Sequence, residues 1–205
     1  VSSTISTMPT TDEDEASVVS YSGMDTTQQR TAAILIIGDE ILKGYTPDTN
    51  TQTAAEALKT HNVRLKYVAV VSDTQEEIAQ EIRRLKNLVD VLITSGGVGP
   101  THDDVTLKSV AQALDCEMVL HDEMAALLVS KMGETKTNAQ IKMATLPTHA
   151  KLRYLSDDPN AWPVLQCKNI FVLPGVPEFF AQKIAHVAEY LSSCHPLEQG
   201  LSYKI

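Results

Sequence analysis

From residue 31 onward, short apolar runs rich in β-branched residues alternate with amphipathic stretches of helical period. Such runs are typical of strands buried in a parallel sheet, and the stretches between them suit crossover helices. The pattern therefore predicts an α/β fold with a mostly parallel central sheet. We expect strands at 33–37, 65–71, 89–94 and 169–173, extended pieces at 117–120 and 152–155, and helices at 49–60, 74–88, 122–132, 136–144 and 176–191.

Length and composition indicate one folded domain. A chain of 205 residues with 43% hydrophobic composition can bury one good core but is too short for two full-sized domains. We place this domain at 31–195, with a turn-rich surface connection at 147–168 that could serve as a lid. Residues 1–30 are acidic and rich in Ser and Thr, so we expect a disordered arm. Because the chain begins with Val and its 196–205 tail resembles a strand start, we expect a fragment of a longer protein.

Charge and cysteine content exclude several classes of protein. The net charge of −9 argues against a nucleic-acid partner, because such proteins present a basic face to the phosphate backbone. No apolar run reaches the roughly 18 residues of a membrane span, so we expect no membrane partner. Cys116, Cys167 and Cys194 lack the spacing of a disulfide framework or a zinc site, and indicate reduced thiols in a cytoplasmic protein.

The segment from Ser95 to Thr106 is the strongest functional signal. Gly96, Gly97 and Gly99 follow a buried strand, and glycine allows a positive φ that turns several N–H groups toward one anion. We expect this glycine turn to bind phosphate, together with Thr101 and a helix that begins just after it and runs to Leu114. A plain strand-to-helix turn explains the same residues equally well.

Two adjacent carboxylates, Asp103 and Asp104, follow the glycine turn. They would repel an anion unless a cation lay between them, and oxygen ligands suit a hard divalent metal such as Mg²⁺ or Mn²⁺. We therefore propose both as metal ligands and catalytic residues, and His102 as a donor to phosphate. The alternative role for either aspartate is to cap the following helix.

Two further segments follow strands, at the sheet edge where open α/β folds bind ligands. After the first strand, Asp39 and Glu40 are candidates for a metal ligand or a base that orients water, and Asn50 is placed to hydrogen-bond across the cleft. Asp48 is more simply explained as a helix cap. After the last strand, a proline- and glycine-rich turn forms either a wall of the ligand site or a rigid helix start; its candidate binding residues are Pro174, Gly175 and Glu178.

Taken together, four co-linear motifs at 38–44, 48–50, 96–106 and 173–178 resemble the MoaB/Mog (molybdopterin-binding-like) domain, over about residues 32–195. Within that family the sequence is most similar to the N-terminal domain of animal FAD synthase, and next to the CinA domain. The resemblance implies a three-layer α/β/α domain. It also implies a phosphate-binding glycine turn, a catalytic role for Asp104 with a divalent metal (Mg²⁺, Mn²⁺ or Co²⁺), a homo-oligomer, and an attached or partner FAD synthase domain.

The function implied by the resemblance is metal-dependent hydrolysis of FAD to FMN and AMP. FMN adenylyltransferase activity is not expected, because the synthase-type domain that carries it in these relatives is not part of this sequence. A second hypothesis is a nucleotide-binding domain that regulates a synthase. A third covers a CinA-like nucleotide pyrophosphatase and a molybdopterin adenylyltransferase; the latter is disfavoured because His102 stands where those enzymes carry Arg.

Overall fold

The structure, a computed structural model, describes residues 29–101, 104–133 and 137–193. The expected tail and residues 1–28 of the expected arm lie outside this part of the chain. Arg30, however, belongs to the folded domain: its guanidinium donates to the carbonyl of Leu191 at 2.5 Å, and its own carbonyl accepts from the N–H of Arg64 at 2.8 Å. The expected arm therefore does not extend to residue 30, because the edge of the sheet uses the backbone there.

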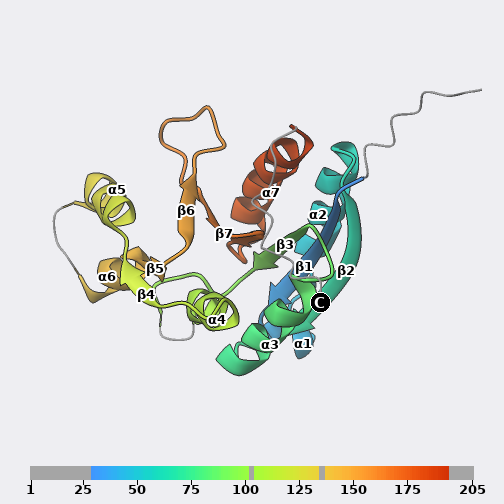
Figure 1. Ribbon diagram of the computed structural model, residues 1–205, viewed down its shortest axis with the longest axis horizontal. Coiled ribbons are helices and arrows are strands. Elements are labelled where there is room, and N and C mark those ends of the chain that lie inside the picture. Colours follow the sequence, from blue (N-terminus) through green and yellow to red (C-terminus); the bar gives the residue numbers. More distant parts are fainter. Residues whose placement is uncertain (1–28, 102–103, 134–136, 194–205) are drawn as a thin grey trace, which may run out of the picture.

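A six-stranded sheet forms the centre of the protein, in the order β2-β1-β3-β8-β7-β6 (Figure 1). The first four strands run parallel to one another, whereas β7 and β6 continue the sheet in antiparallel fashion. The predicted mainly parallel sheet is confirmed. The strands are β1 (Thr31–Ile37), β2 (Arg64–Val71), β3 (Val91–Ser95), β6 (Ala150–Arg153), β7 (Val164–Cys167) and β8 (Ile170–Leu173).

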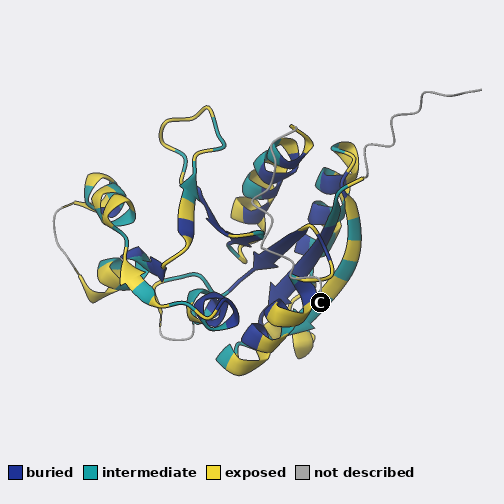
Figure 2. Ribbon diagram, viewed as in Figure 1, coloured by how far each residue is buried: buried dark blue, intermediate teal, exposed yellow. Residues whose placement is uncertain are grey.

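Helices cover both faces of the sheet, which confirms the three-layer α/β/α arrangement. Side chains of β1 alternate between two buried clusters because successive residues of a strand point to opposite faces. Leu35 belongs to the cluster under α3 (Gln75–Leu85) and α4 (Thr106–Ala113), whereas Ile34 belongs to the cluster under α2 (Asn50–Thr60) and α7 (Pro177–Ser192). Figure 2 shows the central strands as a continuous buried band.

A small lobe lies beside this domain, at the left of Figure 1. In it, β4 (Met118–Leu120) pairs antiparallel with β5 (Thr145–Pro147), next to helices α5 (Asp122–Met132) and α6 (Asn138–Ala144). Thr137 and Gln140 form a reciprocal capping box that starts α6. Among the described helices, none has both the length and the apolar character needed to cross a membrane.

The prediction of a surface connection over 147–168 is wrong at both of its ends. β6 lies near its start and β7 near its end, and every residue of β7 is buried. The sequence analysis did not predict β7 because Gln166 is a polar residue within it. This residue is nevertheless only 4% exposed. Its amide accepts from Arg153 Nε at 2.6 Å and donates to the carbonyl of Lys168 at 2.7 Å, which offsets the cost of burial.

Phe171 on β8 is fully buried between the sheet and α7, and its ring meets that of Tyr190 edge-on at 6.1 Å. We expect Phe171→Ala to lower the free energy of unfolding by about 3–5 kcal/mol, because a cavity replaces a large ring in the core. Phe179→Ala is the matched control: this ring is 57% exposed, and its removal should change stability by less than about 0.5 kcal/mol. Urea unfolding of the two variants measures the difference; equal losses would contradict the placement of Phe171.

Candidate functional site

Three loops meet at the carboxyl edge of the sheet because β1, β3 and β8 are parallel neighbours. They follow Ile37, Ser95 and Leu173, and all three line one large cavity of about 1470 Å³. The small lobe, the loop between β6 and β7, and helices α4 and α7 contribute further walls. Open α/β sheets bind ligands at this edge, so the fold brings the predicted motifs to one place.

The glycine turn is built by close backbone packing. Gly96 and Gly97 have φ of +111° and +63°. The Oγ1 of Thr106 donates to the carbonyl of Gly96 at 2.8 Å, and its N–H donates to the carbonyl of Gly97 at 3.1 Å. Within the described part of the chain, the N–H groups of Gly97 and Val98 donate to no backbone carbonyl. They are therefore available to an anion in the cavity.

Asn50 ties the three loops together, as its position predicted. Its Nδ2 donates to Ser95 Oγ at 2.9 Å and to the carbonyl of Gly175 at 2.8 Å. The residue is only 7% exposed, and its Oδ1 has no hydrogen-bond partner among the described residues. An unsatisfied buried acceptor costs about 1–3 kcal/mol, which favours a ligand that supplies the missing donor or cation.

Asp104 is held by its own loop. Its Oδ2 accepts from the N–H of Thr101 at 2.9 Å and from Thr101 Oγ1 at 2.6 Å. Partial burial disfavours the charged carboxyl, but the Thr101 and Gly99 hydrogen bonds and the Lys142 ammonium outweigh it, and the pKa of Asp104 lies below its usual value. Asp104 does not cap α4, which begins at Thr106: the residue at its N-cap position is Val105, and the Asp104 carboxylate accepts from Thr101 instead.

The other acidic candidates separate into two groups. Asp39 is partly exposed and forms an ion pair with Lys43 at 2.6 Å, which lowers the pKa of Asp39, and it does not line the cavity. Glu40 lines the cavity, as does Asp73, whose carboxylate accepts from the N–H of Asp39 at 2.9 Å. The carboxylate of Asp48 accepts from the N–H of Thr51 in the first turn of α2 at 3.0 Å, although the residue at the N-cap position is Thr49.

Most of the predicted site residues therefore face one cavity. The cavity is lined by Glu40, Asn50, Gly96, Gly97, Gly99, Asp104, Pro174 and Gly175. Thr101 and Glu178 are exposed outside that lining, although Thr101 fixes Asp104. The predicted residues His102 and Asp103 lie outside the described part of the chain.

The oxygen atoms of several cavity residues are of the type that a hard divalent cation binds. The carboxylates of Glu40, Asp73 and Asp104 and the unpartnered oxygen of Asn50 are all oxygen ligands, which Mg²⁺ and Mn²⁺ prefer. Among the residues that the structure describes, no three His, Cys, Asp or Glu side chains are grouped closely enough to hold a metal ion. Asp103, the other half of the expected metal pair, falls outside that search.

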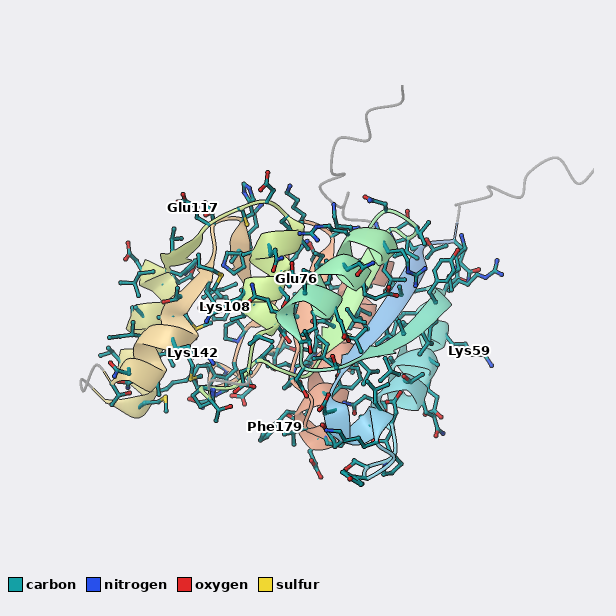
Figure 3. All side chains as sticks on the ribbon, turned by 90° about the horizontal axis from the view of Figure 1, so that it is seen from below. Lys59, Glu76, Lys108, Glu117, Lys142 and Phe179 are labelled. Atoms are coloured by element: carbon teal, nitrogen blue, oxygen red, sulfur yellow. The ribbon has the colours of Figure 1, made fainter. Side chains whose placement is uncertain are left out.

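Several cavity residues were not anticipated. Lys108 on α4, Lys142 on α6 and Lys183 on α7 bring positive charge to a strongly acidic protein. Lys142 reaches from the small lobe to donate to the carbonyl of Thr101, and Figure 3 labels it together with Lys108. No motif marks these lysines. Of the cavity residues that the sequence analysis missed, Asp73 could have been found, because it follows the end of β2 just as the other motifs follow their strands.

Comparison with known proteins places this architecture in a family. Residues 33–192 match the family described as "Probable molybdopterin binding domain". The chain belongs to this family. The family assignment confirms the resemblance to MoaB/Mog domains that the four motifs carried.

Individual proteins that are similar to this chain support the family assignment. The chain is 33% identical over 195 residues to a "Probable FAD synthase" of Caenorhabditis elegans, in a match that covers 85% of this chain and 37% of that protein. It therefore spans little more than a third of that relative. A solved structure of CinA from Thermoplasma acidophilum, described as having unknown function, shares 28% identity with a TM-score of 0.70, over 80% of this chain and 99% of that one.

A more distant structure shows the fold alone. MoaB of Pyrococcus furiosus, described as a tungsten cofactor synthesizing protein, shares 20% identity with a TM-score of 0.51, over 80% of this chain and 93% of that one. A protein from Aeropyrum pernix is 39% identical over 153 residues, in a match that covers 71% of this chain and 56% of that protein.

The glycine turn can be tested with a matched pair of glycines. A Cβ at Gly97 would lie 2.4 Å from Thr106 Oγ1, whereas Gly44, at a similar φ of +71°, has nothing within 4 Å. We expect Gly44→Ala to cost about 1 kcal/mol of unfolding free energy from backbone strain alone. Gly97→Ala should cost at least about twice as much and weaken pyrophosphate binding. Urea unfolding and calorimetric titration provide the two measurements, and equal behaviour of the two variants would contradict this geometry.

The ionisation of Asp104 can be tested through Thr101. Thr101→Val removes the Oγ–H donor, so the pKa of Asp104 should rise toward its ordinary value; Thr60→Val, on α2, is the control. A lowered native pKa stabilises the fold above the unfolded-state pKa, and this contribution is lost as pH falls through the native value. In Thr101→Val this contribution should therefore be smaller, and its loss on acidification should be complete at a higher pH than in the wild type. NMR titration of the Asp104 carboxyl measures its pKa in both variants. An unchanged pKa in Thr101→Val would refute the role of the Thr101 hydroxyl in lowering it.

Proposed function

We propose that this domain hydrolyses a nucleotide pyrophosphate, FAD to FMN and AMP, with the help of a divalent metal. The observation that carries the proposal is the meeting of an anion-binding glycine turn, an Asp104 carboxylate with a lowered pKa, and the unsatisfied Asn50 oxygen in one cavity. Phosphoryl transfer needs mainly positioning and charge neutralisation, which such a set of groups can provide.

The glycine turn binds the pyrophosphate in this scheme. The N–H groups of Gly97 and Val98 donate to its oxygens, and the N-terminus of α4 adds favourable positive potential behind them. Lys108 and Lys142 offset further negative charge from the side of the small lobe. This local positive charge allows an acidic protein to accept an acidic substrate.

A carboxylate near the phosphates has to orient the attacking water. Glu40 lines the same cavity as the glycine turn and is the residue we assign to this task. Glu40 accepts a proton as the water oxygen bonds to one phosphorus and the bridging P–O bond breaks. FMN and AMP then leave as phosphate monoesters, and the bridging oxygen remains with the phosphate that was not attacked.

Asp104 and Asp103 would hold the divalent metal, and Asn50, which lines the same cavity, has a buried Oδ1 with no hydrogen-bond partner among the described residues. A bound metal of this kind neutralises phosphate charge and lowers the pKa of a bound water. Because Thr101 keeps Asp104 ionised and oriented, this carboxylate is ready to bind a cation without a rearrangement of the loop.

The choice of FAD rests on the relatives and on the size of the cavity. The chain is similar to part of a "Probable FAD synthase" of Caenorhabditis elegans, whose name connects it with this dinucleotide. A cavity of about 1470 Å³ exceeds the roughly 300–1,000 Å³ that is typical of drug-sized ligands. There is thus room for both nucleotide halves of FAD.

Asp104→Asn tests the proposal. The substitution keeps the shape but removes the charge, so metal-dependent conversion of FAD to FMN and AMP should fall at least about a hundredfold. Asp115→Asn removes the same charge beyond the far end of α4, at a positive φ of 52° that asparagine tolerates, and should keep full activity. Turnover is followed by chromatography of FMN and AMP with Mg²⁺, Mn²⁺ or Co²⁺.

Two results would decide against this function. Wild-type turnover in Asp104→Asn would place the chemistry elsewhere. If the wild-type domain binds FAD but converts none with any of the three metals, it acts as a nucleotide-binding module that regulates a synthase.

A further inference from the structure

A second wall of the cavity, formed by one face of α7, has a different character from the glycine turn. Phe179, Gln182, Lys183 and His186 line it at the i, i+3, i+4, i+7 spacing of a single helix face. Phe179 is 57% exposed, whereas its neighbour Phe180 is fully buried in the core. Adjacent phenylalanines on α7 thus contribute to the core and to the cavity separately.

Trp162 belongs to the same wall, although it comes from the loop between β6 and β7. Its side chain is 39% exposed and lines the cavity. Lys183 Nζ donates to the carbonyl of Trp162 at 2.6 Å and to that of Pro163 at 3.3 Å. Because Phe179 and Lys183 lie one turn apart on α7, this bond brings the loop of Trp162 to the helix face that carries Phe179.

The loop is held from the small lobe as well. Lys131 on α5 donates to the carbonyl of Asn160 at 2.7 Å, and its ammonium lies 5.5 Å from the centre of the Trp162 ring. Burial lowers the pKa of Lys183, so its place in the wall depends on the two carbonyls that it satisfies. Two lysines from separate helices therefore fix Trp162 before any ligand arrives, as expected of a preorganised binding surface.

Two partly exposed aromatic rings on a fixed cavity wall need an apolar, flat partner to bury them. Trp and Phe faces stack well on conjugated rings, because such pairs remove apolar area and match ring quadrupoles. Phe179 lies in the first turn of α7, directly after the loop of Gly175 that Asn50 binds. The aromatic surface and the glycine turn are consequently parts of one continuous cavity.

We infer that Trp162 and Phe179 form a subsite for a flat aromatic ring of the substrate, while the pyrophosphate lies at the glycine turn. The ring is either the isoalloxazine or the adenine of a dinucleotide, since both offer the same conjugated face. This inference rests on the proposed function for the position of the pyrophosphate, but it concerns binding and not the chemical step.

Binding to the full chain, in EDTA and again with Mg²⁺, tests the subsite. The probes are FAD, FMN, ADP-ribose and inorganic pyrophosphate, measured by calorimetric titration against Trp162→Ala and Phe179→Ala. Each variant should weaken FAD binding about tenfold or more and leave pyrophosphate binding unchanged. Trp162→Phe should stay within about threefold of wild type. Tyr154→Ala, in the same loop but outside the cavity lining, is the matched control and should bind like wild type.

The probes also identify the ring and separate this inference from the proposed function. If the alanine variants also bind FMN more weakly, the ring in the subsite is the isoalloxazine. If they also bind ADP-ribose more weakly, it is the adenine. Unchanged FAD binding in both alanine variants, equal losses for FAD and pyrophosphate, or a wild type that binds none of the ring ligands would each overturn the subsite. Failure of FAD turnover with intact, ring-dependent binding would refute the hydrolase and leave the subsite standing.

Discussion

Close contact of three backbones at the end of β3 is the constraint on which the site depends. A Cβ on Gly96 would lie 2.2 Å from the carbonyl oxygen of Ile37, and a Cβ on Gly175 would lie 3.1 Å from the Cα of Gly96. Only glycine lets the strand-end loops approach this closely. The amide of Asn50 then joins two of them, and the N–H groups of Gly97 and Val98 donate to no backbone carbonyl among the described residues.

The parts of the site that follow from strand order and backbone chemistry were predictable from the sequence. Glycines after a buried strand and Asn50 after the first strand needed only the rule that parallel strands end at one edge. The fold class followed likewise from hydrophobic periodicity. Side chains that arrive from elsewhere, such as Lys142 and Trp162, were not predictable, because a lysine or tryptophan on its own helix or loop has no distinguishing local pattern.

The errors share a physical cause, which is that residue types and hydrophobic periodicity do not show which hydrogen-bond or ion-pair partner a side chain takes. β7 was missed because the burial of Gln166 depends on Arg153 across the hairpin. Asp39 looked equivalent to Glu40, but the Lys43 ammonium holds it at the surface. Asp104 looked like a helix cap, but Thr101, three residues before it, supplies its hydrogen bonds.

The two walls of the cavity differ in how many substitutions, insertions and deletions they can tolerate during evolution. The glycine end allows almost no substitution, because an added carbon would meet neighbouring backbone at Gly96 and Gly175 and a neighbouring side chain at Gly97 and Gly99. The Trp162 end sits on an exposed hairpin loop between β6 and β7, where insertions and deletions leave the core untouched. One end of such a domain can therefore stay fixed on phosphate while the other diversifies, so that related proteins acquire new substrates through the length and composition of a single loop.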